Sequence, residues 1–124
     1  MSMKISETWL DKKWQETIRL LFGHKCAVCG RQGTEAHHIV YRRNRAFRWH
    51  PLNGVLLCKE HHIPFAHEQR KWFTEWLKHN LPAQYKYCID EFNENNITIT
   101  RDGSKNLLIE VEYILTKDVI GRKQ

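Results

Sequence analysis

The stretch that decides the fold lies between residues 26 and 62, and it reads Cys26-Ala-Val-Cys29, then Glu35-Ala-His37-His38-Ile39, then Asn53, then Cys58-Lys-Glu-His61-His62. Two kinds of metal chemistry are interleaved in it. One set of residues suits a closed structural site, and the other suits an open site that leaves room for a substrate. The rest of the chain is ordinary by comparison, so most inferences about function start from this stretch.

Two pairs of candidate ligands, Cys26-x-x-Cys29 and Cys58-x-x-His61, have the same spacing. Each pair can present its ligands from a tight turn, and four such ligands fill a tetrahedral zinc site. Thiolates disfavour calcium and magnesium, so zinc is the predicted ion. A redox dithiol or an accidental spacing are the alternatives, but a dithiol leaves Cys58 and His61 unexplained. His62 could replace His61 as the fourth ligand, although the matched spacing favours His61.

The neighbouring His37 and His38 form the second candidate site. They lie on a predicted strand, so their side chains should face opposite ways. One can hold a metal ion while the other faces the space beside it. A neutral imidazole can activate water near pH 7, and a divalent cation with few protein ligands can stabilise a phosphodiester transition state. The alternative is a zinc-stabilised fold in which these histidines are incidental.

Together these residues resemble the His-Asn-His (HNH) endonuclease motif, in the version braced by a four-ligand zinc site. The match is strengthened by Arg48-Trp-His-Pro-Leu-Asn53-Gly-Val-Leu-Leu-Cys58, which is similar to a pattern of small phage and bacterial HNH nucleases. The resemblance covers about residues 26–67. It implies an α+β fold with a ββα-metal (His-Me finger) core, and a metal-dependent DNA endonuclease that nicks or cuts both strands.

The resemblance also implies a role for each motif residue. His38 would be the general base, and His37 and His62 would hold the catalytic metal. Asn53 would tie a long loop to the strand that carries His38, or would help at the metal. Many family members have Asp at the position of His37. Histidine there shifts the preference toward transition metals, so magnesium, manganese, nickel, cobalt and zinc all stay open.

His67 is a further candidate ligand of the catalytic metal. Some family members have a third histidine four positions after the second, but here His67 comes five positions after His62. On a regular α-helix it would point away from His62. It could reach the metal if Pro64 makes the start of this helix irregular.

The excess positive charge lies in the half of the chain that carries the motifs. Residues 1–62 hold 11 Lys/Arg and 5 Asp/Glu, whereas residues 63–124 hold 9 of each. Guanidinium groups bind phosphate at two points, so an arginine cluster after His38 predicts contacts to DNA. The alternative is a solvated basic loop. The predicted DNA-binding residues are Arg42, Arg43, Arg45 and Arg48.

The remaining sequence predicts one domain over residues 1–124, with its core at about 24–80. The predicted elements, in chain order, are a helix over 6–22, strands near 35–40 and 54–57, helices over about 62–79 and 82–93, and a C-terminal β-hairpin that ends near 116. The hairpin follows from alternating apolar residues on both sides of Asp102-Gly103. Cys88 lies on an apolar stripe and is predicted to be a core residue rather than a ligand.

No apolar run in the sequence has the length of a signal peptide or a membrane span. We therefore expect a soluble protein of the cytoplasm, in a bacterial or phage-infected cell, without a membrane partner. It would act as a monomer or homodimer, in phage recombination or other DNA processing. A non-catalytic, zinc-stabilised DNA-binding module is the alternative function.

Overall fold

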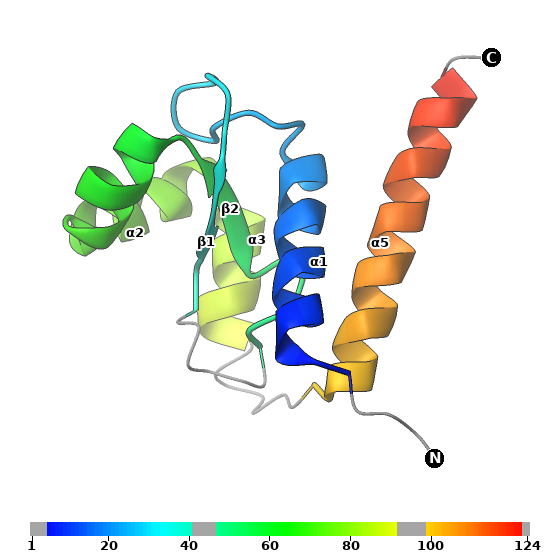
Figure 1. Ribbon diagram of the computed structural model, residues 1–124. Coiled ribbons are helices and arrows are strands. Elements are labelled where there is room, and N and C mark those ends of the chain that lie inside the picture. Colours follow the sequence, from blue (N-terminus) through cyan, green and yellow to red (C-terminus); the bar gives the residue numbers. More distant parts are fainter. Residues whose placement is uncertain (1–4, 41–46, 92–98, 123–124) are drawn as a thin grey trace.

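The computed structural model describes residues 5–40, 47–91 and 99–122 (Figure 1). Its elements are α1 (Glu7–Leu21), β1 (Glu35–His38), β2 (Gly54–Leu57), η1 (His61–His67), α2 (Arg70–Asn80), α3 (Pro82–Tyr85), η2 (Lys86–Glu91) and α5 (Arg101–Arg122), where η marks a π-helical segment. The predicted α+β class is confirmed. No helix in these three ranges is both long enough and apolar enough to cross a bilayer.

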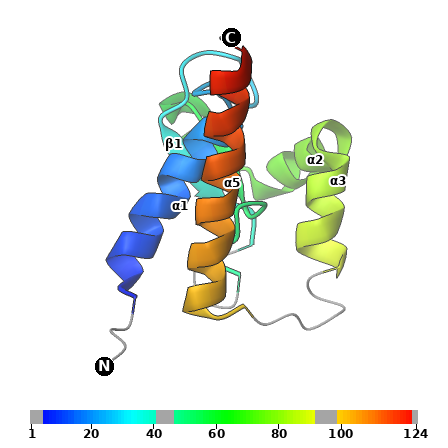
Figure 2. The same ribbon diagram turned by 90° about the vertical axis from the view of Figure 1, so that its right-hand side faces the viewer.

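The first helix begins and ends close to the predicted limits. The Ser6 hydroxyl caps α1 by accepting a hydrogen bond from the Trp9 amide at 3.1 Å. Leu10, Trp14 and Ile18 recur at helical spacing, and all three are buried. They pack on the sheet on one side and on α5 on the other, so α1 lies between the two (Figures 1 and 2).

The two strands pair antiparallel, with His37 opposite Val55 and His38 opposite Gly54. Because side chains alternate along a strand, this register sends the two histidines to opposite faces of the sheet. One face packs on α1, and α5 covers the far side of that helix; the buried residues of this layer are Leu10, Trp14, Ile18, Trp49, Leu56 and Leu108. The other face packs on η1 and α2, through Cys26, Val55, Leu57, Ala66, Phe73 and Leu77.

Gly54 allows α1 to lie directly against the sheet. A Cβ atom at this position would be 2.5 Å from a carbon of Ile18 and 2.8 Å from the ring of Trp14. Such contacts are far shorter than van der Waals separation, so a side chain at this position would require Ile18 and Trp14 to shift. The bare backbone at Gly54 therefore lets Trp14 reach the face of the sheet that carries His38.

The predicted C-terminal hairpin is wrong, because Arg101–Arg122 form the long helix α5. Thr100 caps the start of this helix by accepting a hydrogen bond from the Gly103 amide at 3.0 Å. Ser104 and Leu108 are one helical turn apart and both are buried, so the alternating apolar residues also satisfy a helical period. The same sequence thus fits both a strand and a helix, and the packing of Leu108 against the buried residues of α1 selects the helix.

Two of the predicted helices are confirmed as helical regions but differ in detail. The first is divided into η1 and α2, and the second into α3 and η2, with residues 92–93 outside the described range. Cys88 is fully buried, and burial raises the pKa of its thiol to about 12. Its predicted role as a core residue is confirmed.

His50 is a buried histidine that contributes to the fold. Its ring Nδ1 accepts a hydrogen bond from the Leu52 amide at 3.0 Å, and its Nε2 lies 3.3 Å from the Tyr87 hydroxyl. Burial lowers the pKa of this imidazole from 6.5 to about 4. A proton on Nδ1 would also face the Leu52 amide hydrogen, so the neutral form is the one that the fold accepts.

We predict that His50 makes the protein less stable in acid. Between about pH 6.5 and pH 4 the unfolded chain binds a proton at this position that the folded chain does not. The contribution of neutral His50 to the free energy of unfolding is therefore complete above pH 6.5. It falls by about 3 kcal/mol as the pH falls to 4. His50→Asn keeps an acceptor for the Leu52 amide and does not titrate. The unfolding free energy should depend on pH more steeply in the wild type than in this variant, and equal slopes would contradict the prediction.

Candidate active site and metal centre

Four side chains from two separate segments, residues 26–29 and 58–61, form a closed cluster. The Sγ atoms of Cys26, Cys29 and Cys58 and the Nδ1 atom of His61 all lie within 4.8 Å of one another. The distance between the Cys29 and Cys58 sulfurs is 3.8 Å, and the Cys58 sulfur lies 3.2 Å from His61 Nδ1. In a tetrahedral zinc site, zinc–sulfur bonds of about 2.3 Å separate two sulfurs by about 3.8 Å. The donors and their spacing therefore fit zinc, with His61 rather than His62 as the fourth member.

The surroundings of Cys26 favour its thiolate. Burial raises the pKa of this thiol, but hydrogen bonds from the backbone amides of Cys29, Cys58 and Val28 outweigh burial and lower it to about 6. The pKa of the exposed Cys29 is raised, because the neighbouring sulfurs outweigh a hydrogen bond from the Arg31 backbone. Cys26 is thus the cysteine of the cluster that forms a thiolate most easily. The positive charge of a bound cation would stabilise the thiolate form of the other two cysteines.

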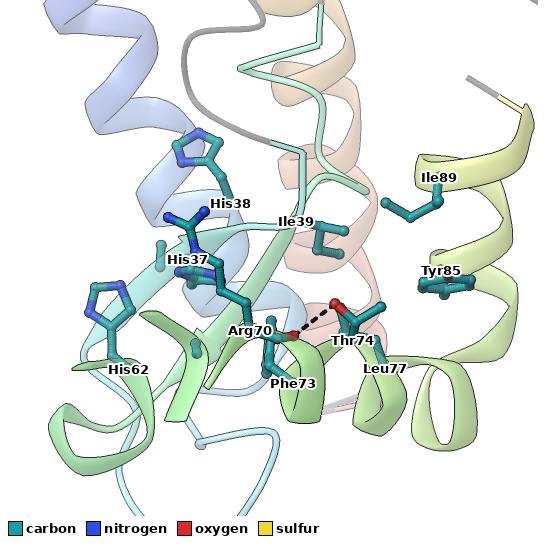
Figure 3. A pocket seen from close by; sticks show the side chains of 12 residues that line it. His37, His38, Ile39, His62, Arg70, Phe73, Thr74, Leu77, Tyr85 and Ile89 are labelled. Carbon is teal, nitrogen blue, oxygen red and sulfur yellow. Dashed lines mark hydrogen bonds between the residues drawn. The ribbon is translucent and has the colours of Figure 1, made fainter. Parts of the chain in front are cut away.

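A second group of side chains lies on the same side of the sheet, toward η1 and α2. The rings of His37 and His62 are 5.2 Å apart between centroids and meet edge to face. Two imidazoles that share one cation have centroids roughly 5 Å apart, given metal–nitrogen bonds of about 2.0–2.1 Å. Phe73 supports His37 by an edge contact at 5.2 Å. The pair borders an open cavity, so a cation held here would keep positions for other ligands (Figure 3).

His38 is held by two contacts on the opposite face of its strand. Its ring stacks on Trp14 with a centroid distance of 3.9 Å and an angle of 8° between the planes. Its Nε2 lies 2.9 Å from the backbone oxygen of Arg48 and donates to it. A neutral imidazole that donates from Nε2 has its acceptor lone pair on Nδ1. These contacts fix both the orientation of the ring and the nitrogen that can accept a proton. His38 also lines the cavity that His37 and His62 border.

Asn53 is fully buried next to the strand that carries His38. Its Oδ1 accepts a hydrogen bond from the Val40 amide at 2.6 Å, and its Nδ2 donates to the Val40 and Phe47 carbonyls at 3.2 and 3.1 Å. Val40 and Phe47 stand on either side of residues 41–46 in the sequence, and one side chain joins these two residues. Because Phe47 is the neighbour of Arg48, the same bonds hold the carbonyl that orients His38.

Residues 26–70, which include both groups of ligands, match a known family model described as HNH endonuclease. This segment is therefore similar to the HNH endonuclease family. The resemblance carried by the motif residues is therefore confirmed, and it indicates a nuclease or DNA-binding function with a metal site. No curated protein and no solved structure matches the chain.

The structure corrects the prediction for one arginine of the HNH segment. Arg48 is only 7% exposed, and its guanidinium donates two hydrogen bonds to the Asp11 carboxylate, at 3.2 and 2.8 Å. Glu7 lies 3.9 Å away on the same helix. Arg48 is thus an internal ion-pair residue that ties the HNH segment to α1, and its guanidinium is occupied by the carboxylates of that helix. Its carbonyl, rather than its guanidinium, serves the candidate site.

Four other predicted site residues are not tested by these contacts. Arg42, Arg43 and Arg45 lie outside the described residues. The backbone of His67 closes η1, but its side chain lies outside the described part as well. All four stay predictions.

Two residues of the site were not expected from the sequence. Trp14 is a buried core residue of α1, and its stacking on His38 depends on a helix that precedes the HNH segment. Arg70 begins α2 and lines the cavity near His37 and His62 (Figure 3). In the sequence, Arg70 is distinguished only as a basic residue eight positions after His62. Its place at the cavity follows from the direction in which η1 leads into α2.

Proposed function

We propose that the protein is a metal-dependent DNA endonuclease in which His38 is the general base and His37 and His62 hold the catalytic metal. The observation that carries the proposal is the placement of His38, which lines the cavity of the other two histidines and whose imidazole is fixed by the Arg48 carbonyl and Trp14. A histidine that serves only the fold would not need this cavity. We infer that β1, β2 and η1 form the ββα-metal core.

In this proposal the residues divide the work by position. His38 accepts a proton from water at Nδ1, because Nε2 already donates to the Arg48 carbonyl. Asn53 is a positioning residue, since it binds the Phe47 carbonyl next to the residue that carries the acceptor for His38. A divalent cation bound by His37 and His62 would neutralise charge on the scissile phosphate and its leaving oxygen. The Cys3His cluster would hold zinc and fix the start of η1 through Cys58 and His61.

The π-helical backbone supports His67 as a third ligand. In η1 the Glu68 amide bonds to the Ile63 carbonyl at 3.2 Å, five residues earlier. A π-turn brings residue i+5 close above residue i, whereas on an α-helix the same residue points away. His62 and His67 have this spacing. The irregular start of the helix therefore removes the geometric objection to His67.

DNA would be held outside the metal sites by Arg42, Arg43 and Arg45, which directly follow the His38 strand in sequence. If several of them neutralise phosphates, the affinity for DNA should fall steeply as salt rises. The proposal further covers one domain over residues 1–124, as a monomer or homodimer. It would act on DNA in bacterial or phage-infected cytoplasm, with a role in phage recombination among the candidates.

Nicking of supercoiled plasmid tests the proposed activity. Purified protein is incubated with magnesium, manganese, nickel or cobalt, each with a matched EDTA control. We expect nicked or linear DNA with at least one metal and none with EDTA, because the histidine pair favours transition metals without excluding magnesium. Binding to DNA without cleavage in every metal would instead identify a non-catalytic DNA-binding module.

A further inference from the structure

A cavity of about 400 Å³ extends from the candidate active site between β1 and the helices α2, α3 and η2. Its two ends differ in chemistry, as Figure 3 shows. His37, His62 and Arg70 lie at one end. Tyr85 and Ile89 lie at the other end, where the lining is apolar apart from one phenol group. A metal ion between the histidines would fill only part of this space, so the apolar end leaves room for a further chemical group.

We propose that the apolar end receives an unpaired nucleobase of the DNA strand whose phosphate lies at the histidine end. The substrate class would then be DNA with an unstacked base beside the scissile phosphate, rather than a uniform duplex. This inference rests on the proposed nuclease function and narrows its substrate.

The order of chemical groups along the cavity matches the order within a nucleotide. A phosphate is anionic and suits a cation held by histidines together with the Arg70 guanidinium. A base is flat and largely apolar on its faces, and proteins hold unpaired bases by stacking on aromatic rings. Tyr85 can supply such a ring, and Lys78 lies 5.6 Å from its centroid, which helps to keep the ring in place.

The middle of the cavity is shaped to admit an apolar group. The hydroxyl of Thr74 donates to the Arg70 carbonyl at 2.9 Å, so it is directed to the helix backbone and not to the cavity. The volume lies at the small end of the roughly 300–1,000 Å³ that small-molecule pockets have. A paired base inside a duplex cannot enter such a pocket, because entry requires leaving the stack.

The experiment compares the affinity of the zinc-loaded protein for three short DNAs in buffer without chelator and without added divalent metal, so that the Cys3His site stays filled while cleavage is not supported. The first is fully paired, the second carries one extra unpaired base, and the third has an abasic nucleotide in place of that base. We expect the second to bind about tenfold more tightly than the first, from stacking of one base, and the third to lose this gain. Equal affinity for the first and second DNAs would overturn the proposal.

Variants of Thr74 locate the effect in the cavity. Thr74→Trp fills the cavity and should abolish the preference, so that this variant binds the fully paired DNA and the DNA with the unpaired base with about equal affinity. Thr74→Val has nearly the same size and should keep the preference. Trp72 lies on the same helix, is 70% exposed and does not line the cavity, so Trp72→Ala should also keep it. A preference that persists in a folded Thr74→Trp protein would overturn the proposal.

Plasmid nicking by the same protein samples separates this inference from the proposed function. Cleavage of plasmid without a preference for the unpaired base would leave the nuclease standing and overturn the base pocket. A preference for the unpaired base without cleavage in any metal would support the pocket and overturn the nuclease.

Discussion

Replacing His38 with glutamine is expected to abolish DNA cleavage while the protein stays folded. Glutamine can still donate a hydrogen bond to the Arg48 carbonyl, and its planar amide can still lie against Trp14. It has no lone pair of suitable basicity to take a proton from water. General-base catalysis contributes typically 10²–10⁴-fold, so we expect the nicking rate to fall by about 10³-fold. Single-turnover nicking of supercoiled plasmid, with the metal that best supports the wild type, measures this loss.

The control for this prediction is another histidine of the same chain. His79 is exposed near the end of α2, outside the cavity lining, so His79→Gln should cleave at the wild-type rate. Zinc content, circular dichroism and DNA affinity should be the same in both variants and the wild type. Cleavage by His38→Gln at a rate near that of the wild type, with contaminating nucleases excluded, would show that another group activates water.

Loss of the Cys3His cluster is expected to have the largest effect on stability. Structural zinc contributes about 10–16 kcal/mol of apparent binding energy in zinc-finger peptides, which equals or exceeds the 5–15 kcal/mol that stabilises a typical domain. The cluster joins the turn at Cys26–Cys29 to the start of η1, and it adds to the backbone bond that Ala27 donates to Leu56 of β2. Cys58→Ser should therefore lose zinc and cooperative unfolding, as should the wild type after chelation.

Cys88→Ser is the matched control for the cluster. Cys88 lies outside it and donates a hydrogen bond to the Leu52 carbonyl at 3.2 Å, which a serine hydroxyl can also make. This variant should keep one zinc per chain and a cooperative melt. Elemental analysis and thermal unfolding followed by circular dichroism give both quantities. A Cys58→Ser protein without zinc but with an unchanged melting temperature would show that the cluster is not structural.

The HNH segment was largely predictable because its chemistry is local in sequence. Matched Cys-x-x-Cys and Cys-x-x-His spacings select four ligands, and the structure brings together the four that the spacing favours. Alternation along a strand separates His37 from His38 without any knowledge of the fold. The same reasoning placed β1 and β2 and the first helix within a few residues of their observed limits.

Prediction failed where two local patterns compete or where a partner is far away in sequence. The apolar residues of α5 satisfy both a strand period and a helical period, and only burial of Leu108 against the α1 layer selects the helix. Arg48 reads as one more member of a basic cluster. Its burial depends on Asp11, which is 37 positions earlier in the chain.

The sequence by itself determined the ligand set, the family of the HNH segment and the faces of the strand histidines, because spacing and alternation are properties of neighbouring residues. The tertiary structure alone decided that Trp14 lies under His38, that the Arg48 carbonyl orients its ring, and that a cavity with an apolar end opens beside His37 and His62. These features arise where separate elements pack against each other. Packing depends on close approach at positions such as Gly54, and local sequence does not encode which element will come to lie there.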